Sequence, residues 1–351
     1  MTPTASRSGF VLLAVLALLV VLSLLAAGVA TTASRAVEQM AMDQERFQSE
    51  LDRFSTRETL LTMLATQRRT LAGLRLEYVN PSAASEGIDE NTDDWLPVGN
   101  EVRLDGRAYI GIGNTHFAIV DDRSRISVNW APPLIRHALY ARLGALPEQW
   151  GRLDDIRLDY QDSDDLRRID GAESDEYERL GLPPPANRPL TSPLELRRLP
   201  VWKTLLEGLS DTDILQMISV TRELSINLNT APTPVLTLLP GVGPENANRL
   251  VALREAAPLT SLMNAQQDFG LAQALDEHLN LYANSAGDLI LWDRRFGTRQ
   301  VVHWTLSTLG NTGKPWRIEY EVTVPRVNLP DQRPALQTQA ALLATTTPDR
   351  P

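Results

Sequence analysis

The twenty residues FVLLAVLALLVVLSLLAAGV, numbered 10–29, decide the fold of this chain. The stretch is apolar apart from Ser23, and no charged residue lies between Arg7 and Arg35. A helix of this length rises about 30 Å, the thickness of the hydrocarbon core of a bilayer. Because a backbone inside a membrane must satisfy its own hydrogen bonds, the segment is expected to be a helical membrane span or a removed signal.

The nine residues before this stretch, MTPTASRSG, leave three interpretations open. A secretory signal would be cut near residues 26–30, but its apolar region is usually about 7–15 residues long. An ordinary signal anchor would stay uncleaved. The third interpretation places the cut between Gly9 and Phe10, because a short basic leader, Gly, Phe and an intact apolar helix resemble a type IV pilin leader. We favour the third, which keeps residues 10–33 as a transmembrane helix.

Residues 34–77 are expected to continue this helix as an amphipathic rod. No proline occurs until Pro81, and apolar residues recur at three- to seven-residue spacings among charged ones. These apolar residues are Val37, Met40, Phe47, Leu51, Phe54, Leu61, Leu64, Leu71 and Leu74. A juxtamembrane coiled coil would show the same pattern. A pilin would instead lay this half of the helix across a sheet.

Strand-like patterns follow in two groups, the first over residues 101–130. Two pairs of short runs there predict hairpins, each around a turn-forming dipeptide. They are 101–104 with 108–112 around Asp105–Gly106, and 116–120 with 125–129 around Asp121–Asp122. The second group lies within residues 287–328 and is rich in Val, Ile, Trp and Tyr; its runs are 289–292, 300–306 and 316–324.

The residues between the two strand groups have helical patterns with many caps and prolines. This order predicts an α+β, pilin-like fold, in which a long N-terminal helix packs on an antiparallel sheet and an all-α domain is inserted in the β region. The expected segments are a leader (1–9), the transmembrane helix (10–33), its amphipathic continuation (34–77), the first part of the sheet (101–130), the inserted domain (131–286), the second part of the sheet (287–328) and a disordered tail (329–351).

The inserted region contains an internal repeat with an offset of 100 residues. ISVNWAP at 126–132 aligns with INLNTAP at 226–232, and five of fourteen positions from Ile126 and Ile226 are identical. In each copy the Asn is expected to cap a new helix, and the Pro suits its first turn. The repeat predicts two related units of the SAM or helix-hairpin-helix kind.

The composition of the chain argues against several classes of function. The 351 residues carry a formal net charge of −10, which argues against a general nucleic-acid or anionic-lipid binder. The absence of cysteine removes disulfides, thiolate metal sites and cysteine nucleophiles. The four histidines have no metal-type spacing, and we find no Ser/His/Asp grouping or phosphate-binding lysine. The chain is therefore not expected to be an enzyme.

The sharpest local motif is Leu-Pro-Gly-Val-Gly-Pro at 239–244. Gly241, Val242 and Gly243 are typical of a helix-hairpin-helix turn, in which glycine allows a tight backbone and the second helix begins with free N–H groups. Those amides bind phosphate in DNA-binding versions. The few basic neighbours, Arg249 and Arg254, favour a packing or protein-binding unit instead.

Acidic residues are concentrated at 159–165 (DYQDSDD) and 171–177 (GAESDEY). Carboxylates at one- to two-residue spacing in a loop that contains glycine suit a hard cation with six to eight oxygen ligands. The spacing is not that of an EF-hand. A solvated acidic surface is the alternative, and calcium fits better than magnesium, which keeps several of its waters.

Taken together, the leader and three motifs resemble one family, the minor pseudopilin K of the bacterial type II secretion system (general secretion pathway protein K). The motifs are LDYQDSDDLRRIDGAESDEY at 158–177, ANRPLTSPLEL at 186–196 and INLNTAPTPVLTLLPGVG at 226–243. The resemblance implies a pilin-like fold with a large helical insertion. It also implies a single-pass inner-membrane protein whose main domain is periplasmic.

The resemblance further implies specific processing and partners. Prepilin peptidase would cleave after Gly9, and the new amine of Phe10 would be methylated. Ala14 occupies the fifth mature position, where ordinary pilins carry a Glu that pairs with a neighbour's N-terminal amine. A subunit without this Glu suits the tip of the pseudopilus. The implied partners are the I and J minor pseudopilins, the major pseudopilin and the inner-membrane assembly platform.

Members of this family bind calcium in the helical domain. The resemblance therefore implies calcium as the cofactor here, with a ligand set at Asp162, Asp164, Asp165, Glu173 and Asp175. Two other functions remain open from the sequence. One is a membrane-tethered DNA receptor of the competence type, which would use the helix-hairpin-helix unit. The other is a minor pilin of a true type IV pilus.

Overall fold

The structure is a computed structural model that describes residues 8–76, 95–293, 295, 297–307 and 313–325. The predicted tail (329–351) and most of the predicted leader lie outside the described residues. The chain forms two compact units, Met1–Asp52 and Arg53–Pro351.

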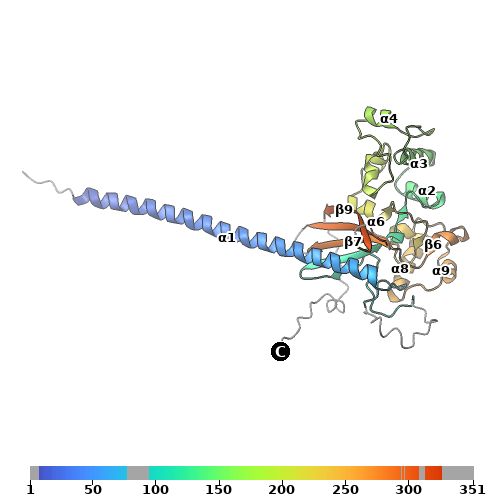
Figure 1. The fold of residues 1–351 in the computed structure, drawn as a ribbon, viewed down its shortest axis with the longest axis horizontal. Helices are drawn as coiled ribbons and strands as arrows, with labels where there is room; N and C mark the ends of the chain where they lie inside the picture. Colours follow the sequence, from blue (N-terminus) through green and yellow to red (C-terminus); the bar gives the residue numbers. More distant parts are fainter. Residues whose placement is uncertain (1–7, 77–94, 294, 296, 308–312, 326–351) are drawn as a thin grey trace, which may run out of the picture. The chain divides into compact units, whose positions relative to one another are not determined.

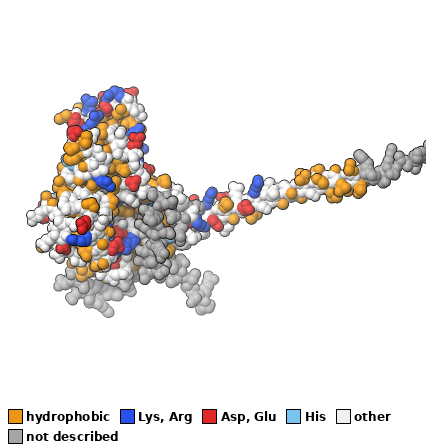
Figure 2. All heavy atoms as spheres, turned by 180° about the vertical axis from the view of Figure 1, so that it is seen from behind, with side chains coloured by type: hydrophobic (Ala, Val, Ile, Leu, Met, Phe, Trp, Pro, Cys, Tyr) orange, Lys and Arg blue, Asp and Glu red, His pale blue; other side chains and the backbone are white. Residues whose placement is uncertain are grey.

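The first unit is helical. It contains most of α1 (Ser8–Thr66), a 59-residue helix that continues into the second unit. By length and composition, α1 is the one helix among the described residues that could cross a membrane, and its most apolar window is not buried at all. Hydrophobic side chains surround the rod in this part (Figure 2). Leu, Val and Ala dominate there, so the sequence supplies both helix-forming residues and a lipid-compatible surface.

The helix ends earlier than its apolar pattern predicts. We expected it to run to residue 77, whereas α1 stops at Thr66, so Leu71 and Leu74 do not belong to a helical stripe. Leu74 exchanges backbone hydrogen bonds of 2.8 and 2.9 Å with Val102. Pairing with a segment distant in sequence therefore overrides the local helical pattern.

The second unit is built on an antiparallel sheet with the strand order β1-β2-β7-β8-β9 among the described residues (Figure 1). The strands are β1 (Tyr109–Ile110), β2 (Thr115–Asp121), β7 (Ala286–Asp293), β8 (Thr298–Leu306) and β9 (Trp316–Pro325). The three runs predicted downstream lie within β7, β8 and β9. The chain leaves the sheet after β2 and returns in its neighbour β7, with Asp121 opposite Gly287.

The two predicted hairpins are wrong. Val102 pairs with Leu74, Asp105 pairs with Val120, and β2 lies between β1 and β7. Asp121 and Asp122 do not form an exposed turn between strands, because both are fully buried and the Asp121 side chain caps a 3-10 turn, η1 (Asp122–Ser124). The insertion therefore occupies residues 122–285 and begins before the predicted boundary at 131.

Each face of the sheet is covered by a different element. On one face, the last turns of α1 contribute Leu60, Leu61 and Leu64 to a core with Leu289 and Trp304. On the other face, Leu215 packs against Val301 and Val324 of the sheet. It belongs to α6 (Asp211–Met217), which Figure 1 draws beside β9. The alternation of inward and outward side chains along β7 and β8 explains both contacts.

The insertion consists of short helices and small two-stranded ladders. Its other α-helices are α2 (Pro133–Arg142), α3 (Trp150–Asp159), α4 (Ser174–Arg179), α5 (Trp202–Leu205), α7 (Thr233–Leu236), α8 (Pro244–Ala256) and α9 (Leu262–Phe269). Its further 3-10 turns are η2 (Pro147–Gln149), η3 (Pro193–Arg198) and η4 (Gln273–His278). Its strands are β3 (Ile126–Ser127), β4 (Ile218–Ser219), β5 (Ile226–Asn227) and β6 (Leu279–Asn280).

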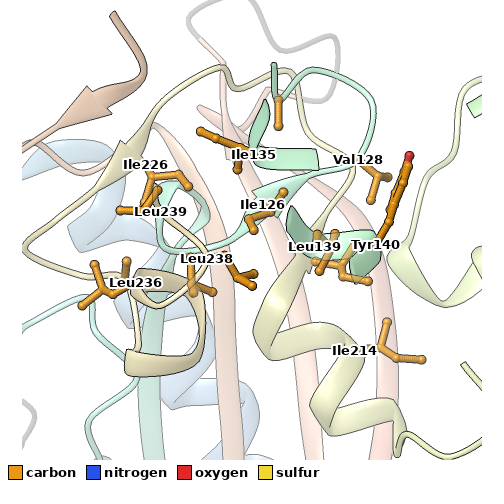
Figure 3. Packing of buried hydrophobic residues seen from close by; sticks show 14 of the residues in the cluster. Ile126, Val128, Ile135, Leu139, Tyr140, Ile214, Ile226, Leu236, Leu238 and Leu239 are labelled. Atoms are coloured by element: carbon orange, nitrogen blue, oxygen red, sulfur yellow. The ribbon is translucent and has the colours of Figure 1, made fainter. Parts of the chain in front are cut away.

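The two copies of the sequence repeat have the same local structure. In each copy a two-residue strand, β3 or β5, pairs in parallel with a distant strand and leads into a helix, α2 or α7. Ile126 and Ile226 start the copies, and their side chains share one buried cluster with Leu139 and Leu239 (Figure 3). The sequence repeat thus corresponds to two structurally similar segments whose side chains pack in one common core.

The predicted role of the repeated asparagines is wrong. Neither α2 nor α7 has a side-chain cap. Asn129 instead exchanges hydrogen bonds with Gln161, and Asn229 donates to the carbonyls of Leu259 and Leu281. These amides are partly or fully buried, and a buried amide needs partners that a helix terminus does not supply in full.

Asp121 holds the two ends of the insertion together. This fully buried carboxylate accepts hydrogen bonds from the Asn284 N–H (2.8 Å), Asn227 Nδ2 (2.8 Å), Thr230 Oγ1 (2.9 Å) and the Arg123 N–H (3.2 Å). Arg123 lies at the start of the insertion, and Asn284 lies at the end of the insertion. Asn227 and Thr230 belong to the second copy of the repeat. Burial raises the pKa of Asp121, against the opposing effect of these donors.

A second buried group connects the insertion with the sheet. Arg125 donates to Asp288 Oδ2 of β7 over 2.5 Å and also contacts Asp122. His303 Nδ1 lies 2.7 Å from the other oxygen of Asp288. Burial opposes ionisation of Asp288, but Arg125 and His303 outweigh it and lower its pKa to about 2. The arginine is therefore neutralised inside the protein, as a buried charge requires.

We expect the substitution Asp121→Asn to lower the free energy of unfolding by about 2–3 kcal/mol, because an amide presents an N–H₂ group where donors now converge. The measurement is the melting temperature of the detergent-solubilised protein. Asp170→Asn, at an exposed position of the same insertion, is the matched control. Equal melting temperatures for the two variants would show that Asp121 does not hold the insertion.

Candidate functional site

The N-terminal candidate residues lie on α1. Gly9 and Phe10 are in its first turn, and Ala14 is exposed about one turn further along. The helix is therefore continuous across the predicted cleavage junction.

Further along the first unit, α1 carries a regular apolar stripe. Its members are spaced alternately by three and four residues, and they are Val37, Met40, Gln44, Phe47 and Leu51. The four apolar members are between 42% and 70% exposed. This is the a/d spacing with which helices pack against each other in coiled coils. Asp43 and Glu50 flank the stripe, so its border is acidic.

The acidic candidate site lies in the insertion, between α3 and α4. Asp159, the last residue of α3, is fully buried. Arg168 binds it twice, through its backbone N–H (3.2 Å to Oδ2) and through Nη1 (2.5 Å to Oδ1). The same Nη1 donates to Asp162 Oδ2 over 2.5 Å. One guanidinium nitrogen therefore bridges two carboxylates.

Glu173 is a further carboxylate near these residues, and its side chain accepts no hydrogen bond among the described residues. Its side chain is 5% exposed, and among the described residues neither carboxylate oxygen has a hydrogen-bond partner. Burial raises the pKa of Glu173 to about 7, and the neighbouring charges of Asp159, Asp162, Asp165 and Asp164 add to the shift. A second oxygen, Asp162 Oδ1, is likewise buried and unpartnered.

The predicted ligand set is only partly assembled. Asp162 is joined through Arg168 to Asp159, which was not in the predicted set, and Glu173 lies near enough for both charges to raise its pKa. Asp164 and Asp165 are exposed and act on Glu173 through their charge. Asp175 is exposed in the first turn of α4. Among the described residues, no three His, Asp or Glu side chains stand ready to hold a metal ion.

The chemistry of the cluster nevertheless fits a hard cation. A buried carboxylate without a hydrogen bond is relieved either by a proton or by a cation. Oxygen atoms from Asp159, Asp162 and Glu173 are of the kind that Ca²⁺ prefers. The loop is also shaped around Asp159, because a Cβ at Gly171 would lie 1.8 Å from Asp159 Oδ2.

The helix-hairpin-helix turn lies between α7 and α8. Gly241 has a φ of +89°, and a Cβ there would lie 2.1 Å from the carbonyl oxygen of Gly270, so this position requires glycine. Val242 is buried in the core of the insertion, and Gly243 precedes α8. The turn also lines an apolar groove of about 640 Å³ with Leu134, His137 and Trp150 as part of the opposite side.

The two arginines that a DNA-binding turn would use are engaged within the protein. Arg249 lies 5.0 Å from the centre of the Phe269 ring and also donates to the carbonyl of Asp268. Arg254 is 5% exposed and donates to the Leu228 carbonyl over 2.7 Å. Arg254 is therefore inaccessible to a phosphate, whereas Arg249 stays exposed. Because phosphate binding depends on several accessible positive charges, this geometry favours the packing interpretation of the turn.

The sequence analysis placed Asp159 in the acidic run but not in the predicted ligand set, and it missed Arg168. Both lie in the motif 158–177 that carries the family resemblance, so the motif located the region. Residue spacing alone could not show that an arginine nine positions later would bind the last residue of a helix. The contact between Arg168 and Asp159 depends on the path of the loop that joins them, and the spacing of residues in the sequence does not predict that path.

The comparisons with known proteins bear on the same region. No curated protein matches the chain. Among solved structures, the chain is similar to a chain of the GspK-GspI-GspJ complex from the type 2 secretion system of enterotoxigenic Escherichia coli. The sequence identity is 15% and the TM-score 0.44, over 81% of this chain and 99% of that chain.

A family model gives the more specific result. The model described as "Type II secretion system (T2SS), protein K" matches residues 124–207, which form the first half of the insertion. It therefore covers β3, α2, α3, α4 and the acidic cluster. Over residues 124–207, the family model confirms the resemblance to protein K of the type II secretion system that the sequence motifs predict.

Proposed function

We propose that this chain is a K-type minor pseudopilin of a type II secretion system. In this proposal it is a non-enzymatic, single-pass protein of the inner membrane, with a cytoplasmic N-terminus and a periplasmic main domain. It would cap the tip of a short pseudopilus and start its assembly for protein export across the outer membrane. The observation that carries the proposal is the protein K match within an insertion between two paired strands.

The absence of a carboxylate at the fifth position from Phe10 supports a position at the tip of the pseudopilus. In a pilus, the fifth-position carboxylate of one subunit neutralises the N-terminal amine of another in an apolar environment. A charge of that kind is costly to bury without its partner. Ala14 cannot provide this carboxylate, so the chain suits a position where no further subunit is added.

The proposed contact with the I and J minor pseudopilins uses the stripe on α1. Side chains with a/d spacing bury apolar surface when a second helix lies alongside. The acidic border at Asp43 and Glu50 favours partner helices that carry basic residues beside their own apolar stripes. The major pseudopilin and the assembly platform would then follow from the initiated complex.

We also propose that calcium binds the acidic cluster. Asp159, Asp162 and Glu173 would hold the ion, with Asp164 and Asp165 available from the exposed part of the loop and Asp175 from the first turn of α4. Bound calcium would supply the positive charge that Glu173 lacks and would tie the loop between α3 and α4 to the end of α3. The support is the buried, unpartnered carboxylate of Glu173.

Processing predicts a mature protein that begins at Phe10 and carries a methylated amine. Mass spectrometry of the protein purified from membranes, in a strain with prepilin peptidase, would detect it. The same strain without the peptidase is the control and should yield residues 1–9 still attached. A chain cut near residue 30, or uncleaved in both strains, would contradict the pilin-type leader.

The stripe predicts that Phe47→Glu reduces co-purification with the I and J pseudopilins of the same genome by about tenfold or more, because a charge would enter the apolar seam between helices. Met42→Glu is a matched control, since Met42 is 60% exposed and lies off the stripe. Equal recovery of partners with both variants would exclude the stripe as the contact surface.

The cation proposal predicts that EDTA lowers the melting temperature of the full-length protein in detergent and that Ca²⁺ restores it. Ligand at 100 times its Kd stabilises the folded state by about 2.7 kcal/mol. Glu173→Gln should abolish the calcium response. Glu178→Gln should retain it, because Glu178 is exposed on α4, the helix that Glu173 precedes. A wild-type protein that melts identically in EDTA and in calcium would refute the site.

A further inference from the structure

We propose that Arg168 is an internal counterion that calcium must displace, so that this arginine sets the affinity of the acidic cluster for the ion. The inference rests on the calcium site proposed above and concerns its regulation. It starts from the observation that one guanidinium nitrogen bridges Asp159 and Asp162.

The charges in the cluster do not balance. Asp159, Asp162 and Glu173 supply three carboxylates, whereas Arg168 supplies one positive charge and contacts two of them. The oxygens left over are buried, namely both of Glu173 and Oδ1 of Asp162. A divalent ion would neutralise more of this charge than the arginine does, and it could take the place of the guanidinium between Asp159 and Asp162, near the unpartnered carboxylate of Glu173.

The guanidinium and the ion would compete for the same oxygen atoms. Asp159 Oδ1 and Asp162 Oδ2 each accept a 2.5 Å hydrogen bond from Nη1 of Arg168. A carboxylate oxygen that binds a cation at about 2.3–2.6 Å cannot keep a guanidinium at hydrogen-bonding distance on the same side. The arginine side chain must therefore move when the ion binds.

The structure provides for that movement. The side chain of Arg168 is 36% exposed, whereas that of Asp159 is fully buried, so the arginine can turn into solvent and the aspartate stays in place. The backbone N–H of Arg168 holds Asp159 Oδ2 independently of the side chain. Gly171 packs against the same oxygen. The anionic site thus keeps its shape after the guanidinium leaves.

Two opposite effects follow for a variant that lacks the charge. Without calcium, Arg168→Gln should destabilise the protein, because Asp159 and Asp162 lose their counterion. With calcium, the variant should bind the ion about tenfold more tightly than the wild type, since no charged hydrogen bonds need to be broken first. At saturating calcium the two proteins should melt at similar temperatures.

The experiment uses the full-length protein in detergent and calcium chloride alone as the probe. Isothermal titration gives the Kd for calcium of the wild type and of Arg168→Gln, and thermal melts are recorded in EDTA and in saturating calcium. Arg167→Gln is the matched control, because this exposed neighbour carries the same charge outside the cluster. Its affinity for calcium should stay within about twofold of the wild type.

An unchanged or weaker affinity of Arg168→Gln would overturn the inference and leave the calcium proposal standing. An equal gain in calcium affinity in Arg167→Gln would also overturn it. The gain would then follow from the lower positive charge of the protein and not from the loss of the contacts of Arg168. Binding by Arg168→Gln but not by the wild type would support the competition and contradict the proposed calcium site in the natural chain. If neither protein binds calcium, both proposals fail.

Arg168→Gln could fold only in the presence of calcium, and that outcome would support the inference, because the ion would be replacing the missing counterion. Arg168→Lys then provides the comparison in EDTA. It retains the charge without the guanidinium fork and should melt between the wild type and Arg168→Gln. A lysine variant no more stable than the glutamine variant would contradict a counterion role.

Discussion

The architecture depends on the hydrogen bonds that converge on the carboxylate of Asp121. This group ends the strand β2, and its acceptors bind donors from the beginning, the middle and the end of an insertion of more than 160 residues. A long chain segment is expensive to order, and its closure entropy grows with length. Fixing its two ends at one buried point lets the helices fold around their own core without disturbing the sheet.

Inside the insertion, buried charge is handled in two contrasting ways. Arg125 is fully neutralised, because Asp122 and Asp288 lie on either side of it and the hydrogen-bond network continues to His303. The acidic cluster after α3 is left incomplete, with Glu173 buried and unpartnered. The first arrangement serves stability. The second stores an electrostatic imbalance that a ligand can relieve, which is typical of a binding site rather than of a packed interior.

Local sequence patterns predicted the elements whose physical cause is local. The apolar run after Phe10 predicts a long helix, and the alternating Val, Ile and Trp residues predict β7, β8 and β9. The α+β fold class, with helices inserted between strands, followed from their order along the chain. The acidic motif predicted a cation site, and that prediction stays untested; of its five residues, Asp162 is joined to Asp159 through Arg168 and Glu173 is buried without a partner.

The predictions that failed all depend on partners far apart in sequence. Asp121–Asp122 has the composition of a turn, yet both side chains are buried acceptors for residues up to 163 positions away. The helix end was misplaced because Leu74 pairs with Val102, and the repeated Asn residues bind neighbouring segments instead of capping helices. The bridging role of Arg168 belongs to the same class. A periodicity describes a residue's own element and carries no information about the element that will contact it.

The register of β2 against β7 determines how the fold can accommodate changes in the length of the chain between them. Asp121 and Gly287 face each other across an antiparallel pair, so the chain could pass from one strand to the other through a tight two-residue connection. The helical domain is then an insertion into an otherwise continuous meander, and it contacts the sheet again through Arg125 and Leu215. A change of length within the insertion leaves the hydrogen bonds between β2 and β7 in place, because both ends of the insertion lie at neighbouring residues of this pair.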